Sequence, residues 1–195
     1  MPRTATVERQ TGETNITLTI DLDGSGRVDV ATGVGFLDHM LAAFGRHGLF
    51  DLTVRATGDY EVDDHHTVED VGIVLGQAVR EALGDRRGIG RFSDVVISMD
   101  EALVQAVIDV SGRGQAYVQL PLPTQKVGTF DTELAREFLI AFARDAALTL
   151  HVRELAGDNS HHIIEAAFKA FGRALRFACE PDPRVTGIPS TKGSL

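Results

Sequence analysis

Cysteine and basic residues are scarce in this chain of 195 residues. The single cysteine, Cys179, excludes an intrachain disulfide and a zinc site built from thiolates, and it indicates a reducing compartment. We expect Cys179 to pack in the core. The 19 basic residues are outnumbered by 28 acidic ones, which gives a formal net charge of -9. This balance argues against a nucleic-acid surface, which needs a basic face, and it suits the binding of metal cations.

Long apolar runs are missing as well. The most apolar stretch, residues 138–150, is interrupted by Arg144 and Asp145 and is too short to cross a bilayer. The first residues lack the apolar run of a secretory signal, and no HExxH motif supports a metalloprotease. With 43% hydrophobic and 24% charged residues, the sequence predicts a soluble, cytoplasmic, globular protein with a single domain over residues 1-195.

The sequence does contain a histidine pair followed by a glutamate, and it contains this motif twice. The two copies are HHTVE at residues 65–69 and HHIIE at residues 161–165. On a helix, residues four apart share a face, so each first histidine lies beside its glutamate. The second histidine points roughly 100° away. One helix can therefore bind one metal through two side chains and offer a single imidazole to another metal.

The first half of the chain is predicted to fold as strand, strand, helix, strand, helix. Alternating Ile and Leu predict the first strand, and apolar residues at helical spacing predict the helices. The predicted ranges are 15–21, 27–32, 35–48, 49–56 and 65–84. Residues 23–26 (DGSG) predict a tight turn that pairs the first two strands in a hairpin. The residues before this strand form a polar arm.

The second half resembles the first. Residues 107–118 resemble residues 19–30, residues 133–152 match the helix and strand that end at Val54, and Phe171-Gly172 matches Leu75-Gly76. Self-similarity near half the chain length indicates duplication, although two helix-strand-helix units could also be alike by chance. The predicted fold class is α+β, with two β-β-α-β-α halves over about residues 7-90 and 91-190.

The alignment of the halves extends the set of candidate metal ligands. Counting back from Leu52 and Leu150 along the preceding helices places His39 opposite Glu137. Each half then offers four ligands: His39, His65, His66 and Glu69, and Glu137, His161, His162 and Glu165. Histidines and carboxylates without cysteine favour Mn(II), Fe(II) or Zn(II), and we prefer manganese. For one copy alone, the alternative is a helix start with solvated polar residues.

Three basic segments are candidates for binding an anion: residues 86–91, 111–114 and 189–193. Glycine lets the backbone approach a phosphate, while Arg and Lys supply charge-assisted hydrogen bonds. Each segment alone is more typical of a solvated loop. Three such segments beside a metal site indicate a phosphorylated substrate.

For most of the other polar residues the sequence predicts no role in binding or catalysis. The acidic pairs at residues 63–64 and 100–101 are expected to cap helices or to face solvent. His151 aligns with Thr53 rather than with a ligand, which indicates a structural role. His47 has no assignment from its spacing.

Five of these segments together resemble the imidazoleglycerol-phosphate dehydratase family, lyases of histidine biosynthesis, over about Val7 to Leu195. They are GFLDHM (35–40), RATGD (55–59), DDHHTVED (63–70), DNSHHIIEAAFKA (158–170) and PSTKG (189–193). The chain resembles the single-function form, because no phosphatase segment is attached. The resemblance implies a helical bundle between two four-stranded mixed sheets. It also implies an octahedral homo-oligomer, a 24-mer of trimers, with active sites between subunits around two Mn(II) ions.

The resemblance also implies roles for individual residues. The metal ligands it implies are His39, His65, His66, Glu69, His161, His162 and Glu165. Glu137 stands where some members have a histidine ligand; a carboxylate there can still bind manganese, but it adds negative charge. The implied phosphate-binding residues are His47, Arg91, Arg113, Ser190, Thr191 and Lys192. Glu13 matches an acid that contacts substrate.

The similar enzymes remove water from imidazole glycerol phosphate, and the resulting enol becomes imidazole acetol phosphate. The resemblance implies two metals that stabilise the ring as an imidazolate, which expels the hydroxyl and leaves a diazafulvene-like intermediate. A carboxylate or a metal-bound hydroxide then removes the carbon-bound proton. The candidate catalytic carboxylates are Glu13, Glu69 and Glu165, and Glu13 is preferred for acid or base work.

Two other functions fit the same residues. Two metals and three basic loops would also suit a metal-dependent hydrolase of phosphate esters. The second alternative is a non-catalytic assembly, in which metal bound by the histidine helices only holds the subunits together. The anion-binding loops argue against this alternative, because such an assembly would not need them.

Overall fold

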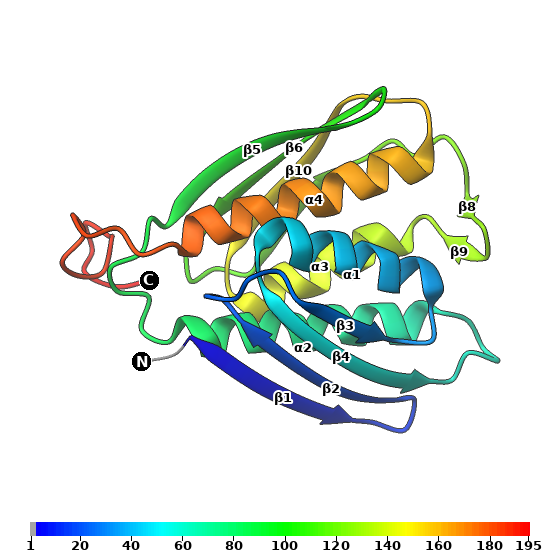
Figure 1. The fold of residues 1–195 in the computed structure, drawn as a ribbon, viewed down its shortest axis with the longest axis horizontal. Coiled ribbons are helices and arrows are strands. Elements are labelled where there is room, and N and C mark those ends of the chain that lie inside the picture. The colour runs from blue at the N-terminus through cyan, green and yellow to red at the C-terminus, as the bar shows by residue number, and fades with distance from the viewer. Residues whose placement is uncertain (1–2) are drawn as a thin grey trace.

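Four helices lie between two four-stranded sheets in the computed structural model, which describes residues 3–195 (Figure 1). The elements of the first half are β1 (Thr4–Gln10), β2 (Thr14–Asp21), β3 (Val28–Ala31), α1 (Gly35–Gly48), β4 (Asp51–Gly58) and α2 (His65–Leu83). Those of the second half are β5 (Phe92–Met99), β6 (Ala102–Asp109), β7 (Gln115–Gln119), β8 (Lys126–Val127), β9 (Phe130–Asp131), α3 (Leu134–Ala146), β10 (Thr149–Ala156) and α4 (Ser160–Cys179).

The two sheets have the same topology. The strand orders are β1-β2-β4-β3 and β5-β6-β10-β7, and β8 and β9 form a separate short pair. In each sheet the last neighbours, β3 with β4 and β7 with β10, are parallel, and the other pairs are antiparallel. This arrangement confirms the predicted α+β fold with a helical bundle between two mixed sheets.

The predicted hairpin between residues 15–21 and 27–32 is wrong. Strand β2 pairs with β1 on one side and with β4 on the other, so both of its edges are occupied. Strand β3 instead lies parallel to β4 on the far side of the sheet. The turn chemistry of residues 23–26 is local, whereas burial of β2 as a central strand decides which strands pair. Alternate residues Ile16, Leu18 and Ile20 are fully buried there.

Each half also begins with one strand more than predicted. Strands β1 and β5 are not expected from the sequence pattern, because each occupies an edge of its sheet and buries few side chains. In β1 only Val7 is buried. The observed order is therefore β-β-β-α-β-α in the first half. In the second half the pair β8–β9 precedes α3.

The ends of α1 and α3 support the predicted alignment of the two halves. Leu49 follows α1 with φ 58°, and Ala147 follows α3 with φ 52°. Both residues donate their backbone N–H to the last turn of the helix. His39 and Glu137 lie the same number of residues before these two caps, so they occupy equivalent positions.

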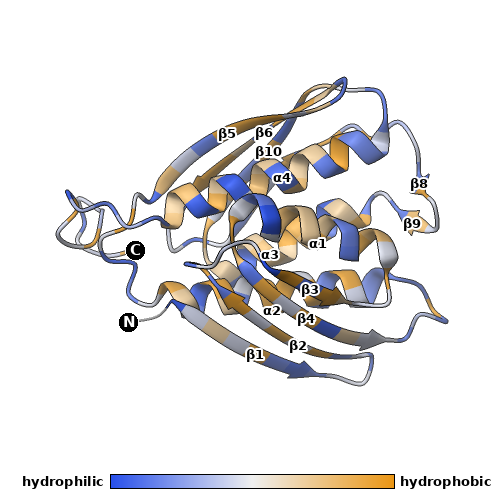
Figure 2. Cartoon of the chain, viewed as in Figure 1, coloured by the Kyte–Doolittle hydropathy of each residue, from blue (hydrophilic) through white to orange (hydrophobic). Residues whose placement is uncertain are grey.

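The core fills the space between the sheets. Strand β6 alternates buried and half-buried residues along its whole length, and the interior faces of the helices are apolar (Figure 2). Cys179 is buried at the end of α4, as expected, and burial raises its pKa to about 12. None of the helices within residues 3–195 is long and apolar enough to cross a membrane.

Glycine brings the helices together in two equivalent pairs. In α4, Gly172 lies against the carbonyl oxygen of Phe44 in α1. In α2, a Cβ atom at Gly76 would lie 2.6 Å from the carbonyl oxygen of Phe142 in α3. Each contact is with backbone, which cannot move away as a flexible side chain can. The matched residues Gly76 and Gly172 therefore set the distance between paired helices.

We expect Gly76→Ala and Gly172→Ala to lower the free energy of unfolding by about 1–3 kcal/mol each, because the added methyl group overpacks a helix contact. The measurement is the midpoint of thermal or urea unfolding of the metal-free protein. Gly35→Ala is the matched control, because a Cβ atom at this helix position meets nothing within 4 Å. Unchanged unfolding midpoints for both variants would contradict the proposed close packing.

Candidate functional site

Three predicted ligands meet between α1 and α4. The Nε2 atom of His39 lies 3.3 Å from Oε2 of Glu165, and Nε2 of His161 lies 3.2 Å from the same oxygen. One ligand atom from each of the three residues falls within 4.8 Å of the others. Two imidazole nitrogens and a carboxylate oxygen suit a divalent transition metal and leave coordination positions open. His39, His161 and Glu165 are named the α1–α4 cluster below.

Local structure at the start of α4 positions this cluster. The Asn159 side chain accepts hydrogen bonds from the backbone N–H groups of His161 and His162, so it caps the helix at the histidine pair. The predicted i, i+4 relation between His161 and Glu165 is confirmed. His39 reaches the same oxygen only because α1 packs beside α4, which places a residue from 126 positions away in contact.

Lys169 keeps Glu165 ionised. Its Nζ atom lies 2.7 Å from Oε1 of Glu165, one turn along α4. Burial alone would raise the pKa of Glu165, but the hydrogen bond and charge of Lys169, together with His39, lower the pKa below its usual value. Oε1 is thus occupied by Lys169, and Oε2 faces the two histidines. The spacing of the motif did not single out Lys169.

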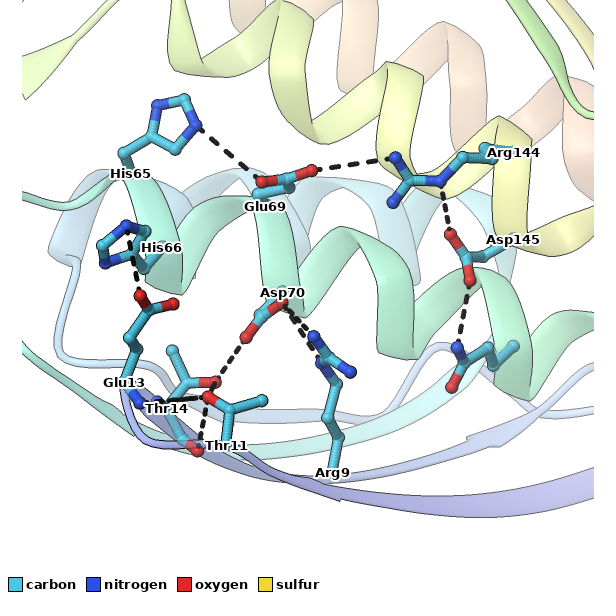
Figure 3. A network of polar contacts seen from close by, with 11 residues as sticks. Arg9, Thr11, Glu13, Thr14, His65, His66, Glu69, Asp70, Arg144 and Asp145 are labelled. Atoms are coloured by element: carbon cyan, nitrogen blue, oxygen red, sulfur yellow. Dashed lines mark hydrogen bonds and ion pairs between the residues drawn. The ribbon is translucent and has the colours of Figure 1, made fainter.

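The corresponding residues of the first half are more widely spaced. Nε2 of His65 lies 3.8 Å from Oε2 of Glu69, and Arg144 from α3 lies 3.8 Å from the other oxygen of Glu69 (Figure 3). Glu137 forms an ion pair with its neighbour Arg136 at 3.3 Å. Among residues 3–195, only the α1–α4 cluster brings three potential ligands together. This chain alone therefore does not join Glu137 to His65 and Glu69.

Each second histidine is held by a carboxylate at its Nδ1 atom. In the first half, Nδ1 of His66 lies 3.0 Å from Asp59. In the second half, Nδ1 of His162 lies 2.7 Å from Glu101. These hydrogen bonds raise the pKa of both histidines and lower the pKa of Glu101 to about 2. Sequence reasoning missed both carboxylates.

The missed carboxylates had weak signals in the sequence. Asp59 belongs to the RATGD segment, which carried the family resemblance but no role for this residue. Glu101 was expected to cap a helix or face solvent; it accepts a hydrogen bond from the backbone of Asn159 but also binds His162. Asp63 accepts a hydrogen bond from the backbone of His65, the first residue of α2, whereas the N-cap residue Asp64 makes no side-chain hydrogen bond to the helix.

Glu13 lies in the exposed turn between β1 and β2. Its Oε1 atom is 3.8 Å from Nε2 of His66 (Figure 3). Close to this turn, Asp70 of α2 accepts hydrogen bonds from Arg9 and from Thr14. This buried network ties the turn to α2 and places Glu13 beside the first histidine pair. His66 and Glu13, distant in sequence, therefore lie side by side.

The three predicted anion-binding segments also meet, at the other end of α4. Arg91 donates hydrogen bonds to Asp109 at 2.8 Å and to the carbonyl of Pro189 at 2.7 Å. Arg113 forms an ion pair of 3.5 Å with the same Asp109. Ser190 accepts a hydrogen bond from the backbone of Lys192, and Thr191 and Lys192 are exposed. Residues 91, 113 and 189–193 are named the anion loops below.

His47 lies apart from the anion loops, near the end of α1. Partial burial lowers the pKa of His47, and so do the positive charges of Lys169 and Arg173 on α4. Within residues 3–195, no hydrogen bond or ion pair joins His47 to the anion loops. The predicted phosphate ligands therefore fall into two groups.

The metal ligands and the anion loops lie at opposite ends of α4 (Figure 1). The histidine pair begins the helix, whereas the backbone of Arg91 donates a hydrogen bond to Ala178 in its last turn. At 1.5 Å per residue, the 20 residues of α4 span about 30 Å. A small substrate cannot reach both ends within one chain.

We expect His161→Ala to weaken Mn(II) binding by about tenfold or more, or ~1.4 kcal/mol, because it removes one ligand of the α1–α4 cluster. The measurement is titration of Mn(II) into chelator-treated protein. His151→Ala is the control, because this exposed histidine on β10 stacks on Tyr117 and touches no predicted ligand. Equal affinities for the two variants would contradict the site.

This chain is similar to known proteins of one family. The profile of the family described as imidazoleglycerol-phosphate dehydratase matches residues 32–175. The enzyme of that name from Granulibacter bethesdensis is 60% identical over 100% of both chains, and that from Desulforamulus reducens is 58% identical over 99% of this chain and 98% of the relative.

Solved structures of the same name are also similar. The dehydratase from Staphylococcus aureus has a TM-score of 0.84 and 41% identity, and the match covers 92% of this chain and 99% of that one. The dehydratase from Pyrococcus furiosus has a TM-score of 0.84 and 37% identity over 97% and 100% of the two chains. The chain therefore belongs to the imidazoleglycerol-phosphate dehydratase family.

Proposed function

We propose that this chain catalyses the dehydration of imidazole glycerol phosphate to imidazole acetol phosphate, a step of histidine biosynthesis. The observation that carries the proposal is the α1–α4 cluster, built by a member of a family whose relatives bear the name of this activity. We place the enzyme in the cytoplasm, where a soluble phosphorylated intermediate would be found.

The donor set fits the two Mn(II) ions that we propose as cofactor. Histidine nitrogens and carboxylate oxygens are ligands that Mn(II) accepts. The proposed ligands are His39, His65, His66, Glu69, Glu137, His161, His162 and Glu165. When bound, Mn(II) would act as a Lewis acid toward the nitrogens of the substrate ring. Glu165 would remain a carboxylate during this binding because of Lys169.

The anion loops would hold the phosphate of the substrate. Arg91 and Arg113 present guanidinium groups beside the segment that contains Ser190, Thr191 and Lys192. Asp109 orients both arginines, and guanidinium groups bind phosphate with directed hydrogen bonds. A fixed phosphate would hold the glycerol chain in one orientation for the loss of water. His47 would add a contact from α1.

Glu13 would move the proton at the reacting carbon. It is exposed at the turn between β1 and β2 and lies beside His66, so a substrate bound next to His66 would be within reach. Glu69 and Glu165, which lie within the metal ligand groups, are the other candidate carboxylates for this proton transfer.

We infer that each active site combines residues of different subunits. The span of about 30 Å along α4 separates the metal ligands from the anion loops, so a second copy must supply the missing half. Contact between copies would also bring further metal ligands next to Glu137 and His65. A 24-mer of trimers with metal sites between subunits is the assembly that we propose.

The test of function is turnover of imidazole glycerol phosphate by metal-stripped protein before and after addition of Mn(II). We expect ketone product only with Mn(II), without free phosphate, because the metal acts on the ring rather than on the ester. Release of phosphate would instead indicate a phosphoester hydrolase. Absence of both products would leave the metal in a purely structural role.

Mixing two defective variants tests whether sites are shared between subunits. His162→Ala should abolish turnover through loss of a metal ligand, and Arg113→Ala should chiefly raise KM through loss of a phosphate contact. After chelation, mixing and addition of Mn(II), some sites would combine an intact metal half with an intact phosphate half. We expect activity at low substrate to exceed the mean of the two separate variants.

No gain on mixing, with subunit exchange verified by native mass spectrometry, would contradict sites shared between subunits. A mixture of His162→Ala with His161→Ala is the control, because both defects then lie in the same half of the site.

A further inference from the structure

We propose that Asp59 and Glu101 are positioning residues that fix the rings of His66 and His162 for metal binding. Each carboxylate takes the Nδ1–H of one histidine and leaves Nε2 of that ring free. The inference rests on the proposed function, because it concerns the same metal ligands. It adds two residues of this chain to the site.

The side chain of Asp59 contacts His66 through both of its oxygens. Its two side-chain oxygens lie 3.0 Å and 3.2 Å from Nδ1 of His66. Within residues 3–195, the Asp59 side chain has no other hydrogen bond or ion pair. The residue follows β4 directly, in the loop that leads to α2. Helix capping and strand pairing therefore do not require this carboxylate.

The contact of Glu101 is shorter and joins two features of α4. Its Oε2 atom lies 2.7 Å from Nδ1 of His162, and its Oε1 atom accepts a hydrogen bond of 3.1 Å from the backbone of Asn159. Asn159 is the residue that caps α4. Glu101 thus fixes the ring of His162 relative to the helix on which this histidine lies.

The two halves make the same contact from different elements. Asp59 follows β4, and the matching residue after β10 is Gly157, which has no side chain. Glu101 instead lies in the turn between β5 and β6, which corresponds to the turn between β1 and β2. Duplication of the fold alone would place a carboxylate at matching positions. The shared feature is the occupied Nδ1 atom.

Both free Nε2 atoms face a second acid. Nε2 of His66 lies 3.8 Å from Glu13, and Nε2 of His162 lies 3.9 Å from Asp100. These distances exceed that of a hydrogen bond, so neither Nε2 atom is hydrogen-bonded to the acid that it faces. Asp100 adopts a left-handed backbone with φ 49°, which is uncommon for a residue other than glycine. Each ring thus has its Nδ1 atom at one carboxylate and its Nε2 atom turned toward another acid.

The chemistry of imidazole explains how a carboxylate at Nδ1 favours metal binding at Nε2. A neutral ring carries one N–H, and a carboxylate at Nδ1 selects the tautomer whose lone pair is on Nε2. The same hydrogen bond stops rotation of the ring before the metal arrives, so less conformational entropy is lost on binding. Partners of this type affect metal affinity by about 10- to 100-fold.

The test compares Mn(II) binding by full-length, chelator-treated protein with Asp59→Ala or Glu101→Ala. Free Mn(II) is measured by electron paramagnetic resonance during titration, and we expect each variant to bind about 10- to 100-fold more weakly at one site. Histidine ¹⁵N spectra of the metal-free protein should show loss of the Nδ1–H tautomer at the affected ring. A merely structural role would not change this tautomer.

Matched controls remove a nearby acid without this contact. Glu61→Ala deletes an exposed carboxylate from the same loop as Asp59, and Asp158→Ala deletes one beside Asn159. Both should bind Mn(II) within about twofold of the parent protein. If an alanine variant fails to fold, Asp59→Leu and Glu101→Met keep a side chain of similar size but remove both acceptor oxygens, and they should show the same loss.

Affinities equal to those of the controls, or unchanged tautomers, would overturn the positioning role. The proposed function fails separately, because it requires turnover. A parent protein that binds Mn(II) without producing ketone would refute the dehydratase while the affinities of the variants still decide the positioning role. Normal turnover by the parent with unchanged affinity in both variants would refute only the positioning role.

Discussion

The close parallel packing of helices in pairs is the constraint on which the rest of this structure depends. Gly172 allows α4 to lie against the backbone of α1, and Gly76 does the same for α2 and α3. A larger separation between α1 and α4 would remove His39 from the oxygen that it shares with His161. The two sheets cover the outside of these pairs and bury their apolar faces. A metal site with ligands on two helices is therefore a consequence of helix distance.

Positive side chains pair with the glutamates of both histidine helices. The chain places carboxylates beside five histidines, and unpaired buried carboxylates would tend to take up protons. Lys169 prevents this at Glu165, while Arg144 approaches Glu69 in the other half. The positive groups lie on the side of each carboxylate away from its histidine. Charge is thus balanced without occupying the oxygen that faces the ligands, so that the negative charge of the chain remains available to a cation.

Much of the fold and the three residues of the α1–α4 cluster could be predicted from the sequence, and the errors have physical reasons. The histidine helices, the duplication and the equivalence of His39 with Glu137 follow from periodicity and alignment, which are local. The hairpin of residues 15–21 and 27–32 was wrong because pairing of strands depends on burial across the whole sheet. Strands β1 and β5 escaped prediction because edge strands bury little. Asp59 and Glu101 were missed because they act across loops.

The sequence by itself determined which of the candidate metal ligands share a helix face, because their spacing along the helix fixes this. His161 and Glu165 are neighbours for this reason alone. Only the tertiary structure decided that His39 joins them, that Arg91 and Arg113 meet at Asp109, and that these two groups lie at opposite ends of α4. Contacts between residues far apart in the chain depend on how helices and sheets pack, and no local pattern in the sequence encodes that packing.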